Sequence, residues 1–180
     1  MRKLTNDELN RLSVDEYRKA EKMPVAIVLD NVRSANNVGS VFRTADCLGA
    51  EKICLCGITA IPPNKDINKT ALGATESVDW KHFATTLDAV AELRAEGYTI
   101  LSIEQAEGSI ALQDFSPVVG RKYALIFGHE VNGVAQEVVD ASDGCIEIPQ
   151  VGTKHSFNIS VSAGITLWEV FTKFRFENID

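Results

Sequence analysis

The sequence predicts a single-domain α/β protein with a mostly parallel sheet flanked by helices. Apolar runs such as VAIVLD at 25–30 and KYALIF at 122–127 have the length and composition of strands buried on both faces, as in a parallel sheet. Segments of helical character separate these runs, and glycines stand where the helices should end. The 180 residues, 45% of them hydrophobic, are enough for one substantial core.

The chain is expected to open with a helical N-terminal arm at 1–23, followed by the domain at 24–176. Thr5 with Glu8 and Ser13 with Glu16 have the spacing of capping boxes, and Pro24 should end the arm. The apolar face of this arm is thin. The sequence therefore leaves open whether the arm packs on the domain or stays solvated.

Strands and helices alternate from Val25 onward. The predicted strands cover 25–30, 52–56, 98–103, 122–127 and 145–148. The predicted helices cover 37–48, 86–95, 134–140 and residues from about 158. Residues 59–77 have no clear period, and their prolines and polar side chains predict an extended surface loop with about one turn of helix.

The net charge of −7 disfavours a nucleic-acid partner, because lysine and arginine drive binding to phosphates. RNA binding nevertheless needs only a local basic surface. A dimer could assemble one from Arg33, Arg43, Lys65, Lys69 and Lys154.

The cysteines and histidines predict no metal site, because they lack the spacing of zinc ligands or of a disulfide framework. Buried free thiols are expected instead. No run reaches the ~18 apolar residues that a membrane span needs, and the first residues lack the apolar stretch of a secretory signal. A cytoplasmic protein is therefore expected.

Three common ligand-binding or catalytic motifs are missing from the sequence. Without G-x-G-x-x-G, a P-loop or G-x-S-x-G, the sequence disfavours dinucleotide binding, nucleotide hydrolysis and esterase chemistry. Polar clusters instead follow three predicted strands, at 31–45, 128–134 and 149–160. Because ligands of open α/β sheets bind beyond the carboxyl ends of the strands, these three segments are expected to converge on one site.

In their order and separation, the three clusters resemble the motifs of the SpoU (TrmH-like) branch of the SPOUT methyltransferases. The first is NVGSVFR at 37–43, the second FGHE at 127–130 with Gly133, and the third IPQVG at 148–152 followed by SFN at 156–158. Two positions depart from the usual pattern, which commonly has asparagine where this chain has His129 and leucine where it has Phe157. The resemblance runs from about Val25 to about Phe174.

The resemblance implies a C-terminal trefoil knot, S-adenosylmethionine as cofactor and a homodimer. Carried over by position, the cofactor pocket would have as its walls Glu104, Gly128, Ile148 and Phe157. Family members pair through the region of the last helix, where Gly164 would permit close contact and the active site would draw on both chains. Many members also carry an RNA-binding extension, and the short arm here leaves the substrate open.

By the same resemblance, the catalytic residues would be Asn37, Arg43, Glu130, Ser156 and Asn158. A guanidinium is effectively never deprotonated, so Arg43 is expected to hold the 2′-oxygen or a neighbouring phosphate rather than to act as a base. Asn37 is expected at a helix start, where it either caps the helix or touches substrate. Glu130 is expected to order Asn37, Arg43 or the nucleotide. Ser156 and Asn158 are expected to provide active-site hydrogen bonds or helix caps.

The implied function is S-adenosylmethionine-dependent 2′-O-ribose methylation of RNA, with tRNA favoured over rRNA. Two alternatives remain. One is base methylation by a SPOUT relative, which the first and third motifs disfavour. The other is a non-catalytic RNA-binding or ribosome-assembly factor that has kept the fold.

Overall fold

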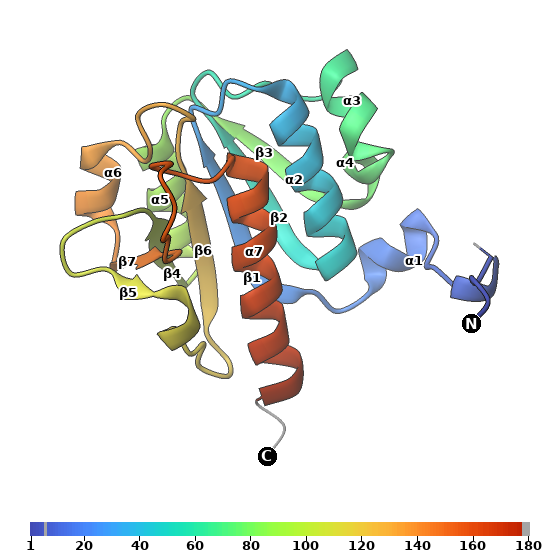
Figure 1. Ribbon diagram of the computed structural model, residues 1–180. Helices are drawn as coiled ribbons and strands as arrows, with labels where there is room; N and C mark the ends of the chain where they lie inside the picture. Colours follow the sequence, from blue (N-terminus) through green and yellow to red (C-terminus); the bar gives the residue numbers. More distant parts are fainter. Residues whose placement is uncertain (6, 178–180) are drawn as a thin grey trace.

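The computed structural model describes residues 1–5 and 7–177, and these form a parallel sheet flanked by helices (Figure 1). The seven strands have the order β3-β2-β1-β6-β4-β7-β5, and every pair is parallel. The strands are β1 Met23–Asp30, β2 Ala50–Cys56, β3 Asp79–Phe83, β4 Tyr98–Ile103, β5 Ile110–Ala111, β6 Lys122–Phe127 and β7 Gly144–Glu147. The α-helices are α1 Val14–Lys19, α2 Ala35–Leu48, α3 Lys65–Ala71, α4 Ala74–Ser77, α5 Thr86–Ala95, α6 Gln136–Ala141 and α7 Ile159–Thr172.

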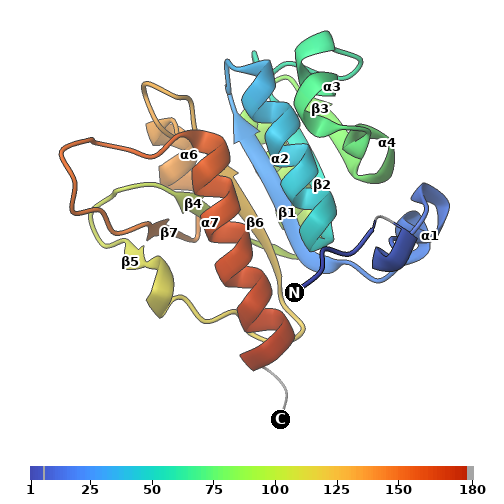
Figure 2. The ribbon, with the colours of Figure 1, turned by 45° about the vertical axis from the view of Figure 1, so that its right-hand side comes forward.

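The sheet has an apolar core on each face, because side chains of one strand alternate between the two faces. On β1, Val25, Ile27 and Leu29 belong to the core that includes α2 and α7, whereas Ala26 and Val28 belong to the core that includes α5 and α6. Figures 1 and 2 show α2 and α7 side by side on one face. The sheet is therefore covered on both sides, as the apolar strand sequences predict.

The predicted strands and longer helices are confirmed, with shifts of a few residues at their ends. α5, β4 and β6 have the predicted bounds. α2 begins at Ala35 rather than at Asn37, because the side chain of Ser34 caps the helix by accepting from the amide of Asn37. Gly49 ends α2 in the left-handed conformation, with φ of 69°.

The prediction of an extended loop at 59–77 is wrong, because this segment contains α3 and α4. Asn64 caps α3 by accepting from the amides of Asp66 and Ile67. Buried Ile67 and Ala71 attach α3 to the core beside α2. The edge strand β3 and the two-residue strand β5 were also not predicted from the sequence.

The N-terminal arm contains a 3₁₀ turn at Asp7–Leu9 and the short helix α1. The predicted capping box of Ser13 and Glu16 is present. Arg18 donates to the carbonyl of Glu76, and the Tyr17 hydroxyl donates to the carbonyl of Ala45. The part of the arm around α1 is thus attached to α2 and α4.

Two of the four thiols match the prediction of buried cysteines. Cys54 and Cys56 are buried, and burial raises the pKa of each thiol to about 12, whereas Cys47 is exposed, contrary to the prediction. Among the described residues no cluster of three or more potential metal ligands occurs, and no helix is long and apolar enough to cross a membrane. The knot and the domain boundaries stay predictions, since strand order alone defines neither.

Candidate functional site

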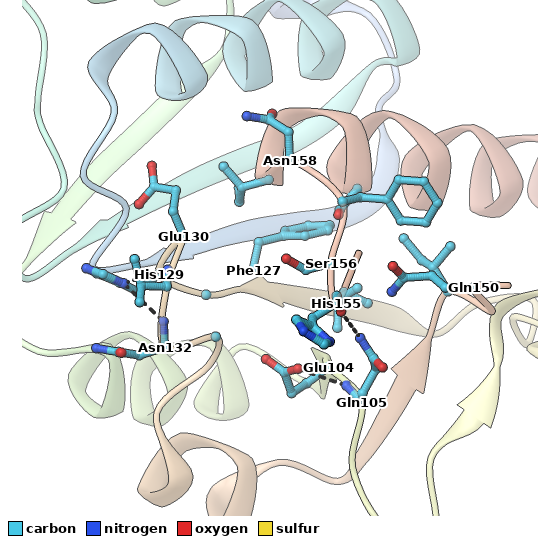
Figure 3. Close-up of a pocket in the computed structure, with 18 residues that line it drawn as sticks. Glu104, Gln105, Phe127, His129, Glu130, Asn132, Gln150, His155, Ser156 and Asn158 are labelled. Carbon is cyan, nitrogen blue, oxygen red and sulfur yellow. Dashed lines mark hydrogen bonds between the residues drawn. The ribbon is translucent and has the colours of Figure 1, made fainter. Parts of the chain in front are cut away.

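A cavity of about 490 Å³ lies beyond the carboxyl ends of β4, β6 and β7 (Figure 3). Ligand pockets of proteins commonly have volumes in this range. The polar clusters at 128–134 and 149–160 line the cavity, and the cluster at 31–45, which includes the start of α2, lies at its border. The lining residues are Ile103, Glu104, Gln105, Phe127, Gly128, His129, Glu130, Val131, Asn132, Gly133, Ile148, Gln150, His155, Ser156, Phe157, Asn158, Ile159 and Ser162.

One wall of the cavity is the tight loop that follows β6. His129 and Gly133 exchange two backbone hydrogen bonds of 2.9 Å, and Gly133 has the left-handed φ of 69°. Gly128 lies so close to the returning strand of this loop that a Cβ there would be 2.1 Å from Gly133 C and from Val134 N. Residue 128 must therefore be glycine for the loop to close.

The carboxylate of Glu130 joins this loop to the start of α2. Its two oxygens accept from the amides of Arg33 and Ser34, each at 2.9 Å, and Oε1 also accepts from Asn37 Nδ2 at 3.2 Å. Burial by itself raises the pKa of Glu130, but these hydrogen bonds outweigh it and leave the pKa below its ordinary value. Glu130 is thus an ionised group whose oxygens are already directed at the α2 end of the site.

The hydrogen-bonded chain continues from Asn37 to α7. Asn158 Nδ2 donates to Asn37 Oδ1 at 3.3 Å, while Asn158 Oδ1 accepts from the amide and hydroxyl of Ser160 at the start of α7. Three segments of the chain therefore meet through Glu130, Asn37 and Asn158, and Asn37 is more than ninety residues from each of the other two in sequence. Figure 3 shows Glu130 and Asn158 on the same side of the cavity.

Two further carboxylates accept hydrogen bonds from the backbone where the loop after β6 ends. Glu104 accepts from the amides of Val134 and Gln105, both at 2.9 Å, and the buried Asp30 accepts from the amide of Ala135 at 3.0 Å. Asp30 also accepts from the Thr86 hydroxyl on α5. Neighbouring backbone amides are therefore fixed by side chains from the ends of β4 and β1.

Most of the predicted site residues meet at this cavity. All four predicted cofactor-binding residues line it, as do Glu130, Ser156 and Asn158, and Asn37 lies at its border. Asn37 does not cap α2, since Ser34 does, whereas Asn158 both caps α7 and contacts Asn37. What each residue does in catalysis stays a prediction.

Arg43 does not line this cavity. It is exposed on α2 and lines a second groove of about 1100 Å³, bordered by the N-terminal arm, α4 and the end of α7. An α-helix has about 3.6 residues per turn. Arg43 therefore lies nearly two turns after Asn37 and on another face of α2. Within one chain, the structure does not bring Arg43 into the cavity.

Sequence reasoning missed several residues of the site. Asp30 ends a strand that is otherwise apolar, and a carboxylate in that place is a signal that could have been used. His129 was noted only as a departure from the usual motif, although its ring accepts two backbone hydrogen bonds. Gln105 donates from its side chain to the carbonyl of His155, and no pattern in the sequence pointed to it.

Gly128→Ala is expected to disrupt the cavity, since the added Cβ overlaps backbone atoms that cannot move without opening the loop. The expected loss is about 1 to 3 kcal/mol of unfolding free energy and at least about tenfold in affinity for the pocket's ligand. Gly152→Ala is the matched control, because a Cβ there meets nothing within 4 Å. Denaturant unfolding measures the effect, and equal stability of the two variants would contradict it.

Comparison with known proteins agrees with the geometry. A family model described as the SpoU rRNA methylase family matches residues 24–168. The TrmH-family protein YacO of Bacillus subtilis is 29% identical over 163 residues, covering 88% of this chain and 64% of its own length. A TrmH-family relative from Staphylococcus saprophyticus is 27% identical over 160 residues, covering 89% of this chain. The chain spans 63% and 64% of the lengths of these two relatives.

Solved structures share the fold. The AdoMet-bound rRNA methyltransferase of Sinorhizobium meliloti has a TM-score of 0.78 at 26% identity, covering 89% of this chain and 60% of that one. The TrmH/SpoU tRNA modifying enzyme of A. aeolicus has a TM-score of 0.79 at 22% identity, covering 91% of this chain and 83% of that one, a likeness of fold alone. Since the family model covers most of the chain, from the first strand of the sheet into α7, the protein belongs to the SpoU rRNA methylase family.

Proposed function

We propose that this chain transfers a methyl group from S-adenosylmethionine to a ribose 2′-hydroxyl of RNA. The observation that carries the proposal is the hydrogen-bonded chain Glu130–Asn37–Asn158 at the border of the cavity. It joins the three polar clusters in an arrangement that can position a hydroxyl beside a ligand in the cavity. Membership of the family and the AdoMet-bound relative from Sinorhizobium meliloti support it.

The cavity has the charge that suits this cofactor. It contains the carboxylates of Glu104 and Glu130, and its lining, as far as the structure describes it, includes no lysine or arginine. Such a lining favours a cation such as a sulfonium and disfavours a nucleotide's phosphates. Apolar walls from Ile103, Ile148 and Phe157 leave room for an uncharged ring. When bound, the cofactor would supply an activated methyl group and its own leaving group.

The task of the protein's own residues is then to orient the acceptor hydroxyl and to stabilise charge on its oxygen. Glu130 holds Asn37 by hydrogen bonding, and Asn158 holds it from the other side. Ser156 lies exposed on the cavity wall, where its hydroxyl is available to a substrate. Arg43 would hold the 2′-oxygen or a phosphate by charge-assisted hydrogen bonds.

A homodimer would bring Arg43 to a cavity, and α7 has the surface for one. Its buried face includes Ala163, Leu167 and Val170, yet the opposite face carries Val161, Ile165 and Trp168, which are 47%, 36% and 56% exposed. A helix that is apolar on both faces normally has both covered. We therefore infer that a second copy covers this face, in agreement with the pairing that the resemblance implies.

Trp168→Glu is expected to produce a monomer without unfolding it, because the side chain is more than half exposed. Removing a large aromatic side chain from the centre of an interface commonly costs about 2 kcal/mol or more of association energy. Ultracentrifugation should show the monomer, and RNA methylation should be lost with the dimer. An equally apolar substitution, Trp168→Phe, is the control. A fully active monomer would contradict the shared site.

RNA is the proposed partner despite the net charge, and tRNA is favoured over rRNA as the first substrate to test. The five basic residues that the sequence analysis assigned to an RNA-binding surface are all exposed: Arg33, Arg43, Lys65, Lys69 and Lys154. A cytoplasmic location follows from this substrate.

Calorimetry with S-adenosylmethionine tests the proposal directly, and the absence of binding would favour a non-catalytic RNA-binding factor. Mapping of 2′-O-methyl sites in RNA from cells with and without the gene then identifies the nucleotide. A methyl group lost from a base rather than from a ribose would favour a base methyltransferase.

A further inference from the structure

The imidazole of His129 holds the turn that presents Glu130. Its Nδ1 accepts from the amide of Val131 at 3.0 Å and from the amide of Asn132 at 3.3 Å. The backbone of His129 is itself paired with Gly133. Figure 3 shows the ring on the opposite side of the loop from Glu104 and His155. The ring thus lies against its own turn and fixes the residue that follows it.

This geometry requires a neutral ring. A nitrogen that accepts two N–H groups needs its lone pair, so the single proton of the neutral imidazole must be on Nε2. Protonation would place an N–H on Nδ1, directed at two other N–H groups. The turn would then lose both hydrogen bonds, and the carboxylate of Glu130 would lose its fixed position relative to Arg33, Ser34 and Asn37.

We propose that His129 is a positioning residue that keeps Glu130 in place only while its ring is neutral, so that methylation falls as the ring becomes protonated. The inference rests on the proposed function, because Glu130 is assigned there to the acceptor side of the site.

The carboxylates around the turn already have other partners. Glu130 accepts from the α2 end, Glu104 from the amides of Val134 and Gln105, and Asp30 from the amide of Ala135. Arg33 donates from its backbone to Glu130, and His155 lies on the far wall of the cavity. Within the part of the chain that the structure describes, none of these side chains is hydrogen-bonded to the ring of His129, so the two amides are the contacts that protonation would break.

Replacing His129 with asparagine distinguishes the role of the hydrogen-bond acceptor from the effect of protonating the ring. Its Oδ1 is bonded to Cγ, as Nδ1 is in histidine, and asparagine side chains accept from amides two residues on in Asx turns. His129→Asn therefore keeps an acceptor that does not titrate near neutral pH, whereas His129→Ala has no acceptor. His82→Asn is the control, since His82 is exposed on the distant edge strand β3.

The test is the pH profile of RNA methylation between pH 5.5 and 8.5 for the four proteins. Wild-type kcat/KM should fall on the acid side and level off about tenfold lower, near the value of His129→Ala. His129→Asn should lack this fall and stay within about threefold of wild type at pH 8, while His129→Ala should be about tenfold slower at pH 8. His82→Asn should keep the wild-type profile.

An NMR titration of the histidine rings reports on the His129 turn and does not depend on a methylation assay. At pH 8, His129 should carry its proton on Nε2, and the amides of Val131 and Asn132 should shift together with the titration of the ring. A proton on Nδ1, or an acid fall that His129→Asn retains, would overturn the proposal. If the NMR result holds but no variant methylates RNA, the proposed function fails, and with it the link from His129 to catalysis.

Discussion

Arg43→Ala is expected to lower the turnover of RNA methylation by about 100-fold to 1000-fold, the usual effect of removing a donor that stabilises charge in the transition state. Arg43 is exposed, so the variant should keep the stability of the wild type and its affinity for S-adenosylmethionine. Arg43→Lys keeps the charge but loses the planar fork, and should recover little of the activity. Near-normal turnover by Arg43→Lys would contradict the geometric role, and single-turnover kinetics measures it.

A heterodimer tests where Arg43 acts, because the structure separates it from the cavity of its own chain. We expect Arg43→Ala and Glu130→Gln each to keep no more than about 1% of wild-type activity on its own. If Arg43 serves the partner's cavity, co-expression with two affinity tags should give a heterodimer with one intact site and about half of wild-type activity. If Arg43 serves its own chain, both sites of the heterodimer are defective. An inactive heterodimer would therefore contradict the shared active site.

Glu130→Gln is expected to cost about 100-fold in turnover while the affinity for S-adenosylmethionine changes by no more than about threefold. The carboxylate accepts from the amides of Arg33 and Ser34 with its two oxygens. A glutamine would direct an NH₂ group at one of these amides, so the start of α2 and Asn37 would shift. Glu137→Gln, on the exposed side of α6, is the control and should behave as wild type.

Glu130→Gln should also change how the free energy of unfolding depends on pH. The pKa of Glu130 is lowered in the folded protein, so the ionised carboxylate stabilises the fold above the unfolded-state value of about 4.3, and this contribution disappears as the pH falls through the folded-state value. The difference in unfolding free energy between wild type and Glu130→Gln should be about 1 to 2 kcal/mol at pH 7 and shrink below about pH 4. A constant difference would assign the effect to packing instead.

The strands could be predicted because each central strand is buried on both faces. β1 and β6 appear in the sequence as unbroken apolar runs, and their observed burial follows that pattern. α3 and α4 could not be predicted in this way, because helices of seven and four residues are too short to show a period. α3 also ends at Leu72 in a left-handed conformation, where glycine or asparagine would be the usual signal.

The location of the cavity beyond the carboxyl ends of the strands could be predicted from the polar clusters, but its individual wall residues could be predicted only through the resemblance. Polar clusters after those strands indicate a site, but not which atoms meet. The bond between Asn37 and Glu130 needs the register of β1 beside β6, which no local pattern specifies. The position of Arg43 on another face of α2 does follow from helix geometry, and it is consistent with the expectation of a second chain.

The packing of α7 on α2 has a consequence for the order of folding. α7 is synthesised after every strand of the sheet, yet Ala163 and Leu167 belong to the same core as Val38 and Phe42 of α2. While the nascent chain still lacks this helix, that apolar face of α2 stays open to water on the ribosome. Asn158 and Ser162 line the cavity and are synthesised with the same helix, so the cavity gains its last wall only when α7 packs.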